Sequence, residues 1–256
     1  MYTRHFPRIP LDLAQGGFFF KQSQNYKAAM PTLLAIDTCS TKCKVALWKE
    51  GSVLLREGNE SQKAAQNVLP LIDDLLRGES VLLDQLDALA VVTGPGSFTG
   101  VRISTGVIQG IAFGADLPVV PVSTLAAIAQ NYFKTSSSNC AFTAMDARMG
   151  EIFWGVYQKN QQGYAELIGE EAVTLAENIV FPEKQGIGIG SGWAVYQQQL
   201  SDRLGNLIQA FEPDHLPRAS AIAQLGVFGF NNNQAVCVEN AMPVYLRDKV
   251  AKKESE

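Results

Sequence analysis

Two aspartates stand where a strand-like apolar run ends and a turn of small residues begins. Asp37 follows the apolar run 33–36, and Asp146 follows the mostly apolar run 141–145. Such turns can direct backbone N–H groups toward a phosphate, while the carboxylate holds a metal-bound water. Alternatively, each aspartate only caps its own turn through side-chain to backbone hydrogen bonds. The turn residues that would take part are Thr38, Thr41 and Arg148.

A glycine-rich loop, residues 94–102 (GPGSFTGVR), is the third feature that could do chemistry. Its glycines and proline favour an unusual backbone, and the helix expected from about Val101 brings a partial positive charge. The loop could therefore face an anion or a nucleotide; the alternative is a rigid hinge in which Ser97 or Thr99 caps the helix. A weaker candidate, the glycine cluster 186–192, could serve as an adenosine loop. The candidate residues are Gly94, Gly96, Ser97, Thr99, Gly100 and Gly190.

Three glycines, Gly106, Gly110 and Gly114, recur every four residues along the helix expected after this loop. Each costs about 1 kcal/mol relative to alanine inside a helix, so something must offset them. Close approach of another backbone is the usual compensation. Packing on the helix's own sheet and contact with a partner chain are both open.

Composition excludes several classes of protein. The 256 residues carry a formal net charge of −4, with 46% hydrophobic and 18% charged residues, which favours a folded chain without a general basic surface for nucleic acid. Two histidines leave little for a His-rich metal site, and His215, in a proline-bounded loop, is expected to be solvated. No apolar run approaches the roughly 18–20 residues that span a membrane. The four cysteines indicate buried thiols in a reducing cytoplasm: Cys39, Cys43, Cys140 and Cys237.

The two ends of the chain differ from the rest in charge. Residues 1–29 hold four Lys and Arg against one Asp, and we expect a disordered leader or non-native extension ahead of Met30; an RNA-contacting arm is the alternative. The remaining residues hold 17 Lys and Arg against 24 Asp and Glu. A short basic tail could touch a phosphate backbone, but is expected to be only solvated. It comprises Arg247, Lys249, Lys252 and Lys253.

The elements that position these residues form a repeated pattern. Each aspartate closes the first of three strand-like runs joined by turns, and the two aspartates are 109 positions apart. The pattern predicts a duplicated α/β architecture of two lobes, each a mixed sheet flanked by helices, over residues 30–134 and 135–256. Helices are expected at 61–76 (capped by Ser61), from 101, at 192–204 and at 219–226, with strands at 86–93 and 186–190.

Four segments occur in an order that resembles the bacterial TsaB (YeaZ) family of tRNA threonylcarbamoyladenosine biosynthesis proteins. They are LLAIDT at 33–38, the loop 94–102, DARMGE at 146–151 and PVYLR at 243–247. The similarity spans residues 30–251. It implies two actin-like (ribonuclease H-like) lobes and a cytoplasmic, non-catalytic subunit without a cofactor.

The resemblance also implies partners. The chain would activate a homologous catalytic subunit, TsaD, which transfers threonylcarbamoyl to the adenosine next to the tRNA anticodon. A small ATPase, TsaE, would join; tRNA would be bound only through the complex, and the chain alone would form a homodimer. A different class of function, a stand-alone actin-fold ATPase or small-molecule kinase, is the alternative.

In the family, the partner is met by the helix after the first strands and the helix after the glycine loop, here residues 61–76 and 101–114. Catalytic relatives hold a metal with two histidines four apart on the first of these helices, and residues 61–68 contain none. We therefore expect no catalytic residue and no metal site, with the aspartate turns as remnants of a nucleotide site. The expected interface residues are Gln66, Leu69, Asp73, Leu76, Arg102, Thr105, Gly106, Gln109, Gly110, Phe113 and Gly114.

Overall fold

A computed structural model of the chain describes residues 30–39, 42–59 and 64–247. The N-terminal segment 1–29, Thr41 and the expected helix cap Ser61 lie outside the described residues. The same holds for three lysines of the basic tail, which are Lys249, Lys252 and Lys253.

The first half of the chain forms a five-stranded sheet in the order β3-β2-β1-β4-β5. The first three strands are antiparallel neighbours, and β4 and β5 run parallel to β1. Glu50 and Gly51 both adopt positive φ, as a two-residue hairpin between right-twisted strands requires. The strands are β1 (Leu33–Asp37), β2 (Lys44–Lys49), β3 (Ser52–Glu57), β4 (Ala88–Gly94) and β5 (Val119–Ser123).

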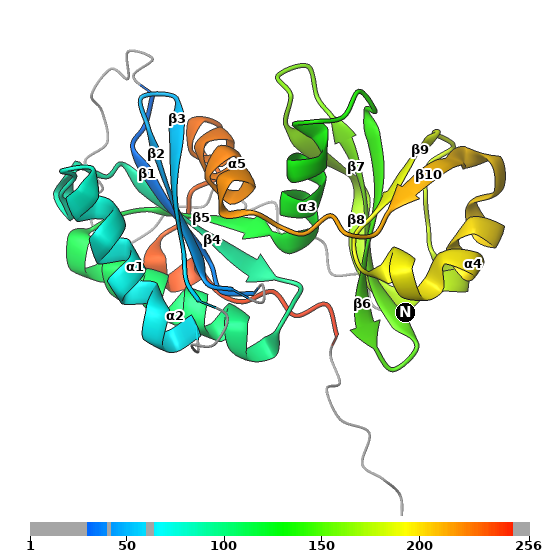
Figure 1. The fold of residues 1–256 in the computed structure, drawn as a ribbon, viewed down its shortest axis with the longest axis horizontal. Helices are drawn as coiled ribbons and strands as arrows, with labels where there is room; N and C mark the ends of the chain where they lie inside the picture. Colours follow the sequence, from blue (N-terminus) through cyan, green and yellow to red (C-terminus); the bar gives the residue numbers. More distant parts are fainter. Residues whose placement is uncertain (1–29, 40–41, 60–63, 248–256) are drawn as a thin grey trace, which may run out of the picture.

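Helices cover both faces of this first sheet, and β1 and β4 are therefore buried along their whole length. Helices α1 (Ala64–Gly78) and α2 (Phe98–Ala115) pack on the outer face (Figure 1). Helix α2 begins three residues earlier than the sequence predicts, because Ser97 caps it.

The second half repeats the strand order of the first as β8-β7-β6-β9-β10. Its strands are β6 (Cys140–Arg148), β7 (Glu151–Lys159), β8 (Ala165–Leu175), β9 (Gly186–Ile189) and β10 (Ile208–Glu212). Helix α4 (Gly192–Leu204) packs on the outer face at the position that α2 has in the first half. The predicted duplication is thus confirmed, and the repeated strand order is that of actin-like lobes.

Two helices lie between the sheets, α3 (Thr124–Phe133) and α5 (Ala219–Asn231) (Figure 1). Although α5 comes late in the sequence, it packs on the first sheet. A Cβ added at Gly226 would lie 2.6 Å from the Cβ of Ala90, so this helix is seated directly on β4. The chain then returns to the sheet edge, where Val236 bridges Val119 of β5.

None of the helices in the described part of the chain combines the length and apolarity that crossing a membrane would need.

Candidate functional site

The two aspartate turns have the same local geometry. Asp37 accepts a hydrogen bond from the N–H of Cys39 at 2.9 Å, and Asp146 accepts one from the N–H of Arg148 at 2.8 Å. Asp37 is fully buried, whereas Asp146 also forms a 3.1 Å ion pair with the exposed Arg148 side chain. These contacts support the interpretation that each aspartate caps its own turn.

The glycine-rich loop packs directly on the first of these turns. The Thr38 hydroxyl donates a buried 2.6 Å hydrogen bond to the carbonyl of Gly100, and a Cβ at Gly100 would lie only 2.3 Å from the Thr38 carbonyl oxygen. Ser97 accepts from the N–H of Gly100 at 3.3 Å and caps α2. Thr99 is exposed, and Gly96 lies against Cys39. The loop therefore seats the start of α2 against the end of β1.

The second half uses glycines in the same way. A Cβ at Gly190, where φ is +95°, would lie 2.5 Å from the carbonyl oxygen of Ala144, and one at Gly192 would lie 2.8 Å from the Cβ of Ala144. Ser191 accepts a 3.3 Å hydrogen bond from the N–H of Asp146. The candidate adenosine loop thus holds the start of α4 against β6.

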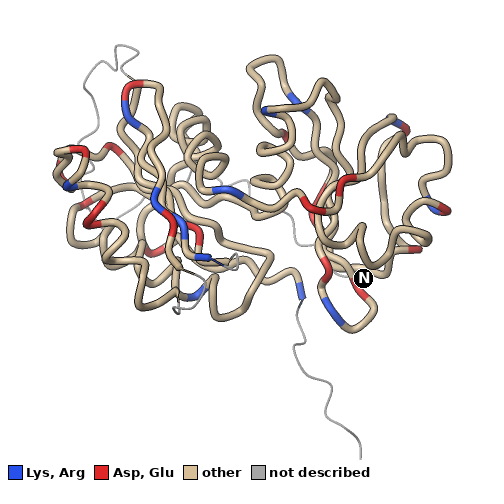
Figure 2. Tube along the Cα trace, in the orientation of Figure 1, with Lys and Arg blue, Asp and Glu red and all other residues tan. Residues whose placement is uncertain are grey.

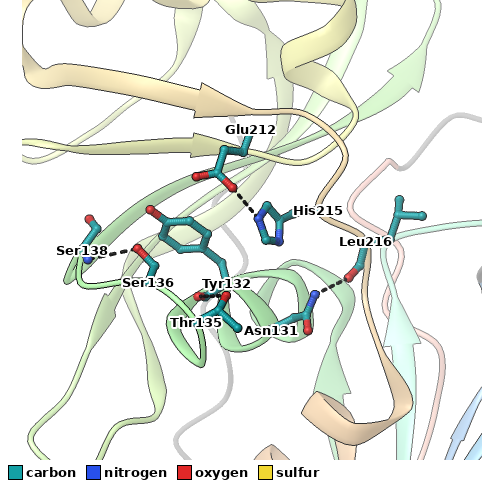
Figure 3. Close-up of polar contacts among 8 residues, drawn as sticks. All are labelled: Asn131, Tyr132, Thr135, Ser136, Ser138, Glu212, His215 and Leu216. Atoms are coloured by element: carbon teal, nitrogen blue, oxygen red, sulfur yellow. Dashed lines mark hydrogen bonds and ion pairs between the residues drawn. The ribbon is translucent and has the colours of Figure 1, made fainter.

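A cleft of about 910 Å³ opens between the two halves, and none of the predicted loop residues lines it. On its wall, His215 and Glu212 form a 2.6 Å hydrogen bond, and Tyr132 meets the His215 ring edge-on at 5.2 Å between ring centres (Figure 3). His215 is therefore not a solvated loop residue as expected; only 22% of its side chain is exposed. The charged lining is of mixed sign: Lys44, Arg56, Lys134 and Arg218 against Glu57, Glu212 and Asp214.

Cys43 and Cys140 are buried, and Cys39 is half-buried. Burial, with the nearby charge of Asp37, raises the pKa of Cys43 to about 11 and that of Cys39 further, so both thiols stay protonated. Cys237 is exposed, contrary to expectation. Within residues 30–39, 42–59 and 64–247, no group of three or more His, Cys, Asp or Glu side chains could hold a metal ion.

The glycine row faces away from the sheet. Gly106, Gly110 and Gly114 are exposed, and a Cβ added at any of them would meet nothing within 4 Å. The interpretation that this row packs on its own sheet is therefore wrong. The row lies on the surface with two large apolar side chains, Phe113 at 80% exposure and Leu69 at 55%.

Two residues that were expected at the interface are buried instead. Leu76 and Thr105 are buried under α1 and α2, at 7% and 4% exposure, because they belong to the helix faces that pack inward. Gln109 is half-buried and donates to the carbonyl of Ala241 at 3.0 Å. The remaining polar positions are exposed: Gln66, Asp73, which pairs with Arg77, and Arg102.

Residues 241–247 run along α2 to the second half, and we call this segment the C-terminal strap. The sequence singled out its residues 243–247 only by their resemblance. The N–H of Val244 donates to the carbonyl of Thr93 at 2.8 Å, and Arg102 donates to the Tyr245 hydroxyl at 3.0 Å. Arg247, expected in a solvated tail, instead forms an ion pair with Glu151. The strap thus joins the α2 surface to the turn between β6 and β7, as the red segment in Figure 1 shows.

Comparison with known proteins gives consistent matches. The family model described as "TsaD: tRNA N6-adenosine threonylcarbamoyltransferase" matches residues 59–255. The tRNA threonylcarbamoyladenosine biosynthesis protein TsaB of Escherichia coli K12 is 36% identical over 225 residues, covering 86% of this chain and 96% of the relative. The Haemophilus influenzae TsaB is 34% identical over 229 residues, covering 86% and 94%. The solved structure of YeaZ from Pseudomonas aeruginosa is 40% identical, with a TM-score of 0.77 over 85% of this chain and all of that one.

Proposed function

Because the chain belongs to the TsaB family of tRNA threonylcarbamoyladenosine biosynthesis proteins, we propose that it is the non-catalytic partner that binds and activates the catalytic subunit TsaD. TsaD transfers the threonylcarbamoyl group to the adenosine next to the anticodon. The ATPase TsaE joins the pair, and without TsaD the chain pairs with a second copy of itself. This assembly works in the cytoplasm.

One observation carries the proposal: the exposed face of α2 has a strip without side chains, flanked by exposed apolar groups. Gly106, Gly110 and Gly114 let another backbone approach closely, and Phe113 on the same helix and Leu69 on α1 expose apolar area. An isolated soluble helix gains nothing from three exposed glycines, each of which costs about 1 kcal/mol. A partner helix seated on the strip offsets that cost.

The kind of partner follows from the homology. The family model that matches residues 59–255 is that of the transferase. We therefore infer that the two proteins share a fold and an equivalent pair of helices. Surfaces of common origin can pair about an approximate twofold axis, each helix pair meeting its counterpart. The same geometry accounts for the homodimer.

A supporting role suits the residues of this chain. The stretch 61–68 lacks the two histidines of the catalytic relatives, and both aspartates are held in turn caps. Basic and acidic residues are interspersed along both halves (Figure 2), and the net charge is −4, so tRNA is reached through the complex.

The test introduces bulk on the strip. Gly110→Leu adds a side chain where a Cβ meets nothing, so the chain folds while the partner is held away. Gln197→Leu places the same side chain on an exposed position of α4 and is the matched control. Light scattering measures the mass of the mixture with TsaD, and tRNA threonylcarbamoylation is assayed with TsaE present.

The expected result is loss of the complex and of modification with Gly110→Leu, and retention of both with Gln197→Leu. Retention of both by Gly110→Leu contradicts the proposal. If the isolated chain instead binds ATP and Mg²⁺ in calorimetry and Asp37→Ala removes that binding, the ATPase alternative is correct.

A further inference from the structure

We propose that the C-terminal strap forms one side of the docking surface, so that the partner's helix lies between the strap and α1 over the glycine row. This inference rests on the proposed function and adds Met242, Tyr245 and Phe98 to the surface. None of these three residues is among those expected from the helices alone.

The positions along α2 place these groups on one line. Phe98, Arg102, Gly106, Gly110 and Phe113 follow one another at spacings of three or four, which is one face of an α-helix. All five positions are exposed, with Phe98 at 46%. The exposed face is therefore continuous from the first turn of α2 to its last.

The strap borders this face along most of its length. Gln109 donates to the Ala241 carbonyl and contacts the Met242 sulfur at 3.5 Å. Further toward the start of α2, Arg102 donates to Tyr245, whose ring centre lies 6.0 Å from that of Phe98. The strap is thus fixed to α2 at two separate places.

The strap leaves its own apolar groups uncovered. Met242 is 57% exposed and Tyr245 is 47% exposed, although each contacts α2 on one side. Helix α1, which shares a core with α2, has the exposed apolar residue Leu69. Large apolar groups thus flank a floor formed by glycines, an arrangement that accepts a helix with small residues at its centre and apolar residues at its margins.

The Arg102 guanidinium defines the polar end of this surface. It stacks 3.6 Å above the Phe98 ring centre while it donates to Tyr245, so its orientation is fixed before a partner arrives. Among the described carboxylates, none is paired with it. A partner helix that ends here with an acidic side chain would form an ion pair with Arg102. The partner is the catalytic subunit, because it carries the equivalent helix pair.

The experiment compares two residues that are equally exposed. Met242 on the strap and Val195 on α4 are both 57% exposed, so Met242→Glu and Val195→Glu introduce the same charge at matched sites. Tyr245→Ala removes the ring, and Tyr245→Phe keeps the ring but removes the hydroxyl. Calorimetry measures the Kd for TsaD, and the melting temperature of each variant shows that it is folded.

We expect Met242→Glu and Tyr245→Ala to raise the Kd at least about tenfold, because the first buries a charge against the partner and the second removes a large aromatic contact. Val195→Glu should stay within about twofold, because α4 lies outside the proposed surface. Tyr245→Phe should raise the Kd less than Tyr245→Ala does, because it keeps the ring and removes only the hydroxyl that holds Arg102. Wild-type Kd in the folded Met242→Glu and Tyr245→Ala variants overturns the inference. In that case, loss of binding with Phe113→Glu keeps the proposed function intact, whereas unchanged binding with Phe113→Glu contradicts that function too.

Discussion

The two halves of the molecule share a strand order and differ in their outer layer. In both halves an aspartate caps the turn at the end of the first strand. In both, a glycine lets the helix that precedes the fifth strand (α2 or α4) pack closely against the end of the first strand. Only the first half has a helix, α1, between its third and fourth strands. The second half has a single 3-10 turn there, Ala176–Asn178.

The equivalent helices α2 and α4 differ in the same sense. Helix α2 continues through 18 residues and exposes the glycine row. Helix α4 has 13 residues, is interrupted at Tyr196 and exposes Val195 and polar residues. What the halves share maintains the fold, and what only the first half has forms the proposed docking surface.

The largest expected effect concerns the glycines that let α2 and α4 pack against the first strand of each sheet. Gly100→Ala pushes a Cβ to 2.3 Å from a backbone oxygen, and Gly192→Ala pushes one to 2.8 Å from the Ala144 side chain. We expect Gly100→Ala to lower the free energy of unfolding by about 3 kcal/mol and Gly192→Ala by about 2 kcal/mol. Urea denaturation measures the free energy of unfolding of both variants. A larger loss with Gly192→Ala than with Gly100→Ala would contradict the ranking by contact distance.

The next prediction concerns the junction between the halves. Ser123, at the end of β5, and Tyr157 of β7 both donate to the carboxylate of Glu171 on β8. Glu171→Ala leaves two donors without their acceptor and should cost about 1–3 kcal/mol. Glu171→Gln keeps an oxygen for both donors and should cost less, as thermal denaturation can measure.

The same residue predicts a pH dependence. Burial raises the pKa of Glu171 above its ordinary value of 4.5, although the hydrogen bonds from Ser123 and Tyr157 oppose the shift. The folded state therefore holds this proton more tightly than the unfolded state, so stability falls as the pH rises from about 4.5 through the folded pKa. The Glu171→Gln variant should lack this decline. An identical pH profile in both proteins would contradict the assignment.

The smallest effect has the opposite sign. Gly106→Ala adds a Cβ that meets nothing, so it should raise the free energy of unfolding by about 1 kcal/mol. The control is Gly226→Ala on α5, where the new Cβ would lie 2.6 Å from Ala90 and should destabilise. Destabilisation by Gly106→Ala would show that the row is packed after all.

Sequence patterns predicted the parts of the fold that show a clear period or a clear turn. The apolar runs of β1 and β4, the aspartate turns and the glycine row were all readable. Strand β5 and helix α3 were missed: Pro121 interrupts the strand, and α3 is buried nearly all round, which removes the amphipathic period.

The wrong predictions at the proposed docking surface also arise where the sequence shows no clear period. Leu76 and Thr105 stand at the borders of apolar stripes, where spacing alone does not decide which way a side chain points. The contacts of Tyr245 and Arg247 join residues about a hundred or more positions apart, so no local pattern encodes them.

The position of α5 has a consequence for biosynthesis. Leu33 and Ala90 of the first sheet are covered by a helix that ends at Asn231, so the ribosome delivers the strands long before their cover. The first half made is therefore the last to be closed, and its inner face stays open until the second half has been synthesised. Docking of α5 on β1 and β4 is therefore the step that completes the first half.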